Sequence, residues 1–293
     1  MDFLKLIADR VVLFDGAMGS MLFASGLQGG DCPEEWNITH PETITHIHDS
    51  YYKAGSDVVE TNSFGGSSLK LASYGFADKA VELNEKAAQL AKKVAPPNSF
   101  VAGSVGPCGQ FIKPLGDLDE ETLYESFKEQ ICALVNGGAD IICIETMMDI
   151  TEATIAVRAA KENTTAPVIA TMTFSATPRG YFTMMGVDPN TAAQKLVKGG
   201  ADVVGANCGN GPHEMVELIP AFAAAVDAPL LFQSNAGLPK LVDGNTVYDM
   251  GPQEYAAFIP DFLKAGAGLI GGCCGTTPEH MSQIKKLLQE LRR

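Results

Sequence analysis

The sequence predicts a single α/β domain, residues 1–293, that folds as a (β/α)8 TIM barrel. Three observations lead to this fold class. Short apolar segments ending in Gly, Asn, Ser or Cys recur eight times, and each is followed by a helical pattern. The segments are continuously apolar rather than alternating, as in parallel strands covered on both faces. The chain is also long enough for one such barrel, which typically takes about 250 residues.

The predicted strands follow one another from the N-terminus, with a helical segment after each. Eight such units in one chain favour a closed barrel over an open, doubly wound sheet. In order, the segments are VVLFDGAMG (11–19), DVVETNSFGG (57–66), FVAGSVGPCG (100–109), DIICIETMMD (140–149), PVIATMTFS (167–175), DVVGANCGN (202–210), PLLFQSNAG (229–237) and GLIGGCCGTT (268–277).

Helix ends are marked by residues with special backbone preferences. The segments YYKAGSD, VNGGAD, VKGGAD and LKAGAG each place glycine where a helix ends in a left-handed residue. Asp188 and Thr277 each precede a proline, which is the arrangement of an N-cap and a first helical position. The stretches 20–40 and 175–188 are predicted to be long connections. No linker-like stretch divides the chain, so we expect one domain.

The composition argues against two classes of partner. The formal net charge of −14 repels a nucleic-acid backbone. No apolar run approaches the roughly 20 residues that a membrane-spanning helix needs. The first residues, MDFLKLIADRVVLFDG, lack the pattern of a secretory signal. We therefore expect a cytoplasmic protein whose seven cysteines are reduced thiols or metal ligands.

In a barrel of this kind the chemistry gathers at the carboxyl ends of the strands. The candidate functional residues are therefore the polar and sulfur-containing side chains at those ends. They are Asp15, Glu60, Thr61, Asn62, Ser104, Glu145, Thr146, Asn207, Cys208, Asn235, Cys273 and Cys274.

Three cysteines in this set point to a metal. Cys208 ends the sixth predicted strand and the Cys273–Cys274 pair ends the eighth, so only the seventh strand separates them. Neighbouring strands lie about 4.8 Å apart, which brings the three sulfurs within reach of one another. Both members of the pair reach one site only if the chain bends, which the flanking glycines permit. Three thiolates with one open position are typical of catalytic zinc. Core filling and a redox pair are the alternatives, although a redox pair usually has C-x-x-C spacing.

A zinc ion on three thiolates carries a net charge of about −1, so it is a poor Lewis acid for hydrolysis but can bind a fourth thiol. A thiol bound there is deprotonated and electron-rich, and S-alkylation is the chemistry indicated. Asn235 ends the strand between the cysteine strands. Its side-chain oxygen is a candidate for the open zinc position until substrate displaces it. Asn207 either orients a ligand sulfur or caps the next helix.

At these residues the chain resembles the homocysteine S-methyltransferase family, and most closely its cobalamin-dependent methionine synthase branch. The resemblance covers essentially the whole chain and rests on the motifs DGAMGSML, WNITHPE, DVVETNSFGG, GSVGPCG, IETMMD, GANCGNGP and GGCCGTTPEH. It implies a Zn²⁺ ion on Cys208, Cys273 and Cys274. It further implies that L-homocysteine sulfur takes the fourth position and that methionine is the product.

The resemblance also implies how the amino-acid end of homocysteine is held. Asp15 and Glu145 are similar to the family residues that receive the α-ammonium, and a charged acceptor is what a desolvated ammonium requires. Asp15 has the alternative role of a turn former before glycine. The substrate carboxylate is expected to meet backbone N–H groups of glycine-containing turns. Those turns contain Gly16, Ala17, Ser104 and Val105, and the family stretch DVVETNSFGG adds Asn62 as a candidate.

The methyl donor is a separate question. Methionine synthases of the cobalamin type continue into folate, corrinoid and reactivation domains, whereas this sequence has no DxHxxG cobalamin-binding motif. It is either an excised domain or a protein whose methylcobamide arrives on a separate corrinoid protein that docks at the barrel mouth. The alternatives are betaine or S-methylmethionine as donor, another thiol as acceptor, or a zinc- and thiol-binding module without turnover of its own.

Overall fold

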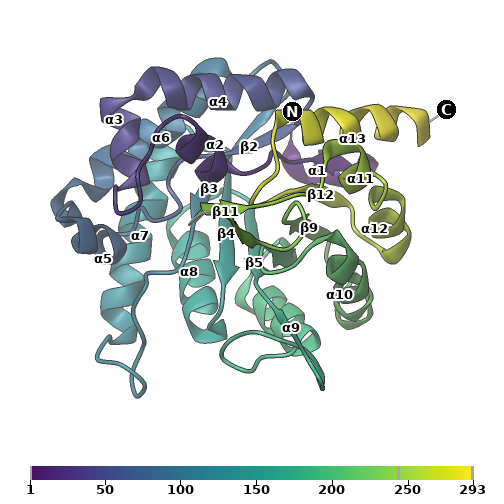
Figure 1. The fold of residues 1–293 in the computed structure, drawn as a ribbon. Helices are drawn as coiled ribbons and strands as arrows, with labels where there is room; N and C mark the ends of the chain where they lie inside the picture. The colour runs from purple at the N-terminus through teal and green to yellow at the C-terminus, as the bar shows by residue number, and fades with distance from the viewer. Residues whose placement is uncertain (1, 243–244, 292–293) are drawn as a thin grey trace.

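The eight predicted strands form one barrel in the computed structural model, which describes residues 2–242 and 245–291 (Figure 1). All paired neighbours are parallel, in the order β1–β12–β9–β8–β5–β4–β3–β2. The Asp57 N–H donates to the Leu13 carbonyl at 2.7 Å and joins the two ends of this order. The strands are β1 (Val12–Leu13), β2 (Val58–Glu60), β3 (Phe100–Val105), β4 (Ile141–Met147), β5 (Val168–Met172), β8 (Val203–Asn207), β9 (Leu230–Ser234) and β12 (Leu269–Gly272).

A ring of helices surrounds the strands (Figure 1). An apolar layer of buried side chains fills the space between strands and helices. The predicted fold class is therefore confirmed. The main helices of the ring are α4 (Pro41–Ala54), α6 (Ala80–Val94), α7 (Glu120–Asn136), α8 (Ile150–Asn163), α9 (Pro189–Gly199), α10 (Pro212–Ala225), α12 (Ile259–Ala265) and α13 (Pro278–Leu291). Shorter ones are α1 (Phe3–Asp9), α2 (Met18–Ala24), α3 (Trp36–Thr39), α5 (Ser68–Leu71), α11 (Pro252–Ala256), η1 (Pro33–Glu35), η2 (Ala72–Tyr74) and η3 (Ala77–Lys79).

The predicted helix boundaries are also confirmed. Gly55, Gly138, Gly200 and Gly266 all have positive φ angles, between 106° and 118°, at the ends of the helices that lead into strands. A residue with a β-carbon is strained in this conformation, which is why glycine stands there. Asp188 caps α9 by accepting from the Thr191 N–H at 3.0 Å. No helix in the described part of the chain combines the length and hydrophobicity needed to cross a membrane.

The inside of the barrel is a second apolar core. It contains one or two buried side chains from each of the eight barrel strands, and Phe3 and Leu6 of α1 pack into it. The Phe3 ring meets Phe100 edge-on, with 5.4 Å between the centroids. Helix α1 therefore covers the amino end of the barrel, and the opposite, carboxyl end is left for a functional site.

Three aspartates tie strands together at the amino end of the barrel. Each stands directly before a barrel strand and donates its N–H to a carbonyl at the start of the preceding barrel strand. Its carboxylate accepts the N–H of that same residue. The pairs are Asp57 with Leu13, Asp140 with Val101, and Asp202 with Val168, at distances between 2.7 and 3.0 Å. This repeated clamp explains the aspartate in GSD and GGAD.

The connections predicted as long loops contain regular structure. The stretch 20–40 holds most of α2 together with η1 and α3, and 175–188 holds a hairpin of β6 (Ser175–Thr177) and β7 (Gly180–Phe182). Another hairpin, β10 (Lys240–Val242) with β11 (Asn245–Val247), follows β9 and was not predicted. Elements of three to seven residues are too short to show a periodic pattern in the sequence.

Candidate active site

A cavity of about 390 Å³ opens at the carboxyl end of the barrel. Its wall is built from residues at the carboxyl ends of the strands and in the connections that follow them, as the fold class predicts. Among the lining residues are the predicted candidates Gly16, Ala17, Glu60, Thr61, Asn62, Ser104, Glu145, Thr146, Asn207, Cys208, Cys273 and Cys274, together with Phe64 and Gln233.

The three cysteines that the sequence placed at strand ends lie together at this cavity. Their sulfur atoms are all within 4.8 Å of one another, and the Sγ atoms of Cys208 and Cys274 are 3.9 Å apart. A tetrahedral zinc ion with Zn–S bonds of about 2.3 Å holds its sulfurs about 3.8 Å apart. The cluster therefore fits a zinc ion with little movement, and its soft donors suit zinc.

The backbone bends where the sulfurs converge. Strand β12 ends at Gly272, and the following turn carries both cysteines to the cavity before Gly275, which has a φ of 80°. Cys208 itself has a φ of 59°, a left-handed conformation that is uncommon for a residue with a β-carbon. The N–H groups of Cys208 and Cys273 donate to Gln233 and Ser234 of β9 at 3.0 and 2.8 Å. Strand β9 thus fixes both cysteine turns.

Cys274 has the most acidic of the three thiols. Hydrogen bonds from the Cys208 and Cys273 thiols, and from the Tyr248 hydroxyl, stabilise its thiolate and lower the pKa of Cys274. Hydrogen bonds to Cys208 and Cys274, together with burial, raise the pKa of Cys273. The Tyr248 side chain lies close to Gly275, which leaves no room for a β-carbon there. A bound cation would remove this asymmetry, because it favours all three thiolates.

Three carboxylates lie beside the sulfur cluster. Glu145 accepts from the Ser104 hydroxyl at 2.5 Å and from the Asn207 amide at 3.3 Å. Glu60 accepts from the Gln233 amide at 3.1 Å, and its N–H donates to Asp15 at 3.0 Å. Among the described residues, one oxygen each of Asp15 and Glu60 is buried without a hydrogen-bond partner.

The carboxylates are held in an environment that favours their protonated forms. Burial raises the pKa of Asp15, Glu60 and Glu145, and the charge of Glu60 raises the pKa of Asp15 and Glu145 further. Buried carboxylates with unused acceptor oxygens are suited to receive a cation that arrives with a ligand.

Three predicted site residues do not line the cavity. Asp15 is only 1% exposed and lies behind Glu60, to which it is hydrogen-bonded. Val105 is fully buried. Asn235 is buried in the turn after β9, where its N–H donates to the Asn210 carbonyl at 3.0 Å. Its side-chain oxygen has no hydrogen-bond partner within the described ranges.

The predicted contacts to a substrate carboxylate are partly occupied within the protein. The N–H of Ala17 donates to the Thr276 hydroxyl at 3.2 Å, and that of Ser104 donates to the Thr61 hydroxyl at 3.0 Å. The Asn62 amide nitrogen donates to the Pro33 carbonyl at 2.8 Å and so ties down the segment that carries η1. These residues line the cavity, and whether they contact substrate stays a prediction.

The sequence reasoning gave no role to Glu60 or Thr146 and omitted Gln233 and Phe64. Thr146 has a φ of 59°, which is unusual for a β-branched residue. Gln233 lies in the apolar strand segment PLLFQSNAG, and a polar residue at that place was the available signal. Phe64 is 43% exposed at the cavity, and its ring leaves no space for a side chain at Gly106.

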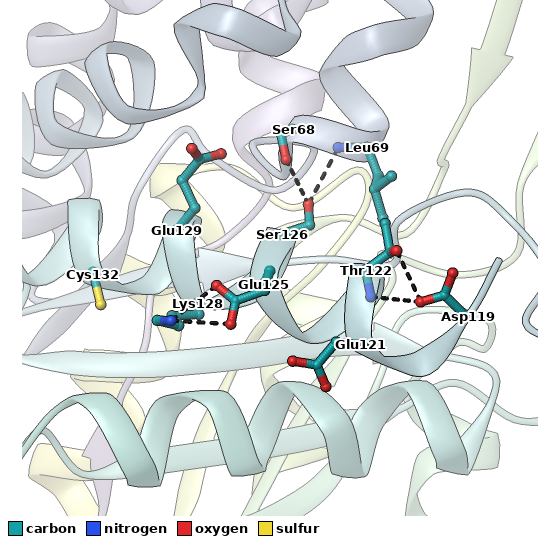
Figure 2. A pocket seen from close by; sticks show the side chains of 10 residues that line it. All are labelled: Ser68, Leu69, Asp119, Glu121, Thr122, Glu125, Ser126, Lys128, Glu129 and Cys132. Atoms are coloured by element: carbon teal, nitrogen blue, oxygen red, sulfur yellow. Dashed lines mark hydrogen bonds and ion pairs between the residues drawn. The ribbon is translucent and has the colours of Figure 1, made fainter.

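A second, open hollow of about 650 Å³ lies on the outside of the barrel near α5 and α7 (Figure 2). Two of the four carboxylates that line it have partners within the protein: Asp119 accepts from the Thr122 N–H, and Glu125 binds Lys128 at 2.9 Å. It shares no lining residue with the cavity at the barrel mouth. The sulfur-lined cavity is therefore the candidate active site.

Comparison with known proteins agrees with this geometry. Residues 12–288 match the family model for homocysteine S-methyltransferase. The methionine synthase of Mycobacterium tuberculosis (strain ATCC 25618 / H37Rv) is 32% identical over 312 residues, which cover 100% of this chain and 26% of that protein. The methionine synthase of Mycobacterium leprae (strain TN) is 32% identical over 303 residues, 97% of this chain and 25% of that protein.

A solved structure shows the same fold. The metallated form of the homocysteine methyltransferase MmuM from Escherichia coli superposes with a TM-score of 0.79 at 23% identity, and the match covers 97% of this chain and 98% of that one. The chain spans about a quarter of the length of the curated relatives it matches. The family match over nearly the whole barrel confirms the resemblance found in the sequence: the chain belongs to the homocysteine S-methyltransferase family.

Proposed function

We propose that this chain is a zinc-dependent S-methyltransferase that binds L-homocysteine and accepts a methyl group on its sulfur to give methionine. The observation that carries the proposal is a three-sulfur cluster beside buried carboxylates in one cavity. A zinc ion on Cys208, Cys273 and Cys274 would bind the substrate sulfur and keep it a thiolate at neutral pH. Asn235, whose buried side-chain oxygen is unpartnered among the described residues, is proposed as the ligand that substrate displaces.

The carboxylates hold the other end of the substrate. Homocysteine carries an α-ammonium group, and this cation supplies the positive partner that the buried carboxylates lack in the free protein. Glu145 lines the cavity and takes the ammonium directly, with Glu60 as a second lining carboxylate. Asp15 supports them from behind through its hydrogen bond with Glu60. We propose that the substrate carboxylate meets the turns that contain Gly16, Ala17, Ser104 and Val105, near Asn62.

A methylcobamide on a corrinoid protein or domain is the proposed methyl donor. Direct transfer requires the donor to reach the cavity opening. Several large apolar side chains are exposed in the strand-to-helix connections on that side of the barrel and provide a docking surface. They are Phe23, Phe64, Phe111, Leu115, Met184 and Leu238.

All seven cysteines are free thiols in the structure, which suits a reducing compartment, and we propose the cytoplasm.

The experiment that tests the binding of zinc and homocysteine is zinc analysis with zinc K-edge X-ray absorption, with and without L-homocysteine. One zinc per chain that changes from three sulfurs and a lighter atom to four sulfurs supports the proposal. Absence of zinc from reduced protein, or coordination that ignores homocysteine, refutes it. Turnover with methylcobalamin, betaine or S-methylmethionine then identifies the donor.

A further inference from the structure

The side-chain amide of Asn207 is the point where the carboxylate side and the sulfur side of the cavity meet. Asn207 is the last residue of β8, is 1% exposed and precedes Cys208. Its oxygen accepts from the Thr146 N–H and from the Thr171 hydroxyl, both at 2.7 Å. Its nitrogen donates to the Thr146 hydroxyl at 2.7 Å and to Glu145 at 3.3 Å. Both donor hydrogens and both acceptor lone pairs of the amide are therefore used.

Two of these bonds hold Thr146 in an unfavourable conformation. Thr146 has a φ of 59°, where a β-branched side chain meets its own backbone. The Asn207 amide binds the backbone N–H and the hydroxyl of the same threonine, so it clamps that residue at two points. The register between β4 and β5 shifts between Ile144 and Met147 at this place. As a result, the consecutive residues Glu145 and Thr146 both line the cavity, which a regular strand does not allow.

The same amide also reaches the sulfur cluster. Its nitrogen lies 3.9 Å from the Cys273 sulfur, and the next residue along the chain is Cys208. Cys208 has a left-handed φ of 59°, like Thr146. A displacement of Asn207 therefore changes the position of Glu145 relative to two of the three sulfurs.

We propose that Asn207 is a positioning residue that sets the separation between the Glu145 carboxylate and the sulfur cluster, and so makes the cavity selective for thiols that carry an amine at the spacing of homocysteine. This inference rests on the proposed function, in which sulfur and ammonium are bound at these two places. Asn207 acts through Thr146 and Glu145 and has no reacting atom of its own.

The test compares two ligands that differ only in the amine. L-homocysteine and 4-mercaptobutanoate have the same thiol and carboxylate, and the second lacks the amino group. Their dissociation constants are measured by calorimetry on zinc-loaded wild type and on Asn207→Ala, with the zinc content of each protein. We expect Asn207→Ala to weaken homocysteine binding about tenfold, as for one hydrogen bond to a charged group. Binding of 4-mercaptobutanoate changes less than twofold, and zinc is retained.

A matched control separates positioning from general support of the turn. Asn210 lies three residues after Asn207, is also buried, and donates its amide to the Phe174 carbonyl at 2.7 Å. It has no hydrogen bond to Glu145 or Thr146 among those found in the described residues. Asn210→Ala is expected to leave the ratio of the two dissociation constants unchanged, whatever it does to stability.

A rescue variant tests the route through Thr146. Glycine adopts a positive φ without strain, so Thr146→Gly needs no clamp. In that background Asn207→Ala is expected to cost homocysteine binding at most about threefold, less than in the wild type. Equal loss for both ligands, loss of zinc, or the same loss with and without Thr146→Gly would overturn the positioning role. Wild type that binds neither zinc nor homocysteine would instead refute the proposed function, a different result.

Discussion

The Ser104 hydroxyl donates to the Glu145 carboxylate at 2.5 Å and turns this buried acid toward the cavity that holds the cysteines. The other oxygen of Glu145 receives the Asn207 amide at 3.3 Å. Two neutral donors thus orient the carboxylate without neutralising it. Burial raises the pKa of Glu145, and a ligand cation that binds beside it would favour its ionised form.

Glu145→Gln should weaken homocysteine binding by about tenfold to a hundredfold and leave zinc in place, because the amide cannot replace a charged hydrogen bond to ammonium. Calorimetry with L-homocysteine and metal analysis of the same samples measure both quantities. Glu152→Gln is the matched control, since Glu152 is buried and accepts the Cys108 N–H at 2.7 Å outside the cavity. Loss of zinc from Glu145→Gln would contradict the assignment of Glu145 to the substrate amine.

The buried carboxylates should make the free protein less stable as pH rises. Burial raises the folded-state pKa of Glu60 above its ordinary value of 4.5, so the folded state retains a proton that the unfolded state has lost. The contribution of Glu60 to the free energy of unfolding is therefore fully present below about pH 4.5, and it is lost as pH rises through the raised pKa. Glu60→Gln should be more stable than wild type at pH 7 and equal to it at pH 4, as measured by urea unfolding.

The exposed Glu290→Gln serves as the control for Glu60→Gln and should show no such crossover. A Glu60→Gln variant that is less stable than wild type at both pH values would mean that the carboxylate is bound by a partner that stabilises its charge. Ligand binding should weaken in the stabilised variant, because functional sites often keep charges that cost stability.

His48 should destabilise the protein in mild acid. Its side chain is fully buried in α4, burial lowers its pKa from 6.5 to about 4, and both ring nitrogens lack partners in the described ranges. Below pH 6.5 the unfolded state gains a proton that the folded state refuses, so stability falls between pH 6.5 and 4, by about 3 kcal/mol at most. His48→Phe should remove this loss in urea unfolding at pH 7, 5.5 and 4. Parallel curves for variant and wild type would refute the prediction.

At Asp140, the hydrogen bond that clamps two strands should contribute more to stability than the ion pair with Lys92. Asp140→Ala leaves the Val101 N–H without its carboxylate partner and should cost about 1–3 kcal/mol of unfolding free energy. Lys92→Ala removes only the partly exposed ion pair to the same carboxylate and should cost less than about 1 kcal/mol. Urea unfolding measures both variants. Equal costs would show that the ion pair, rather than the strand clamp, is what matters at Asp140.

The fold and the sulfur cluster were predictable because both follow from where strands end. Continuous apolar segments fixed the strands, and residues at their carboxyl ends had to share one face, which brought Cys208 to Cys273 and Cys274. Which of the carboxylates faces the cavity was not predictable in the same way. Whether Asp15 or Glu60 faces the cavity depends on how β1 and β2 meet at the barrel seam, and sequence periodicity carries no information about that contact.

The exposed apolar side chains at the barrel mouth predict a difference between protein-bound and free methyl donors. Met184 is 66% exposed in the connection before α9, and Met184→Asp should raise the KM for a methylcobalamin-loaded corrinoid protein about tenfold, as expected when a charge enters an apolar contact. Turnover with free methylcobalamin should change less than twofold, because it needs no docking surface. Leu4→Asp, on α1 at the opposite end of the barrel, is the control and should alter neither. An equal loss of turnover with both donors would mean that Met184 affects the reaction in the cavity and not docking. No loss with either donor would show that Met184 is not part of the docking surface.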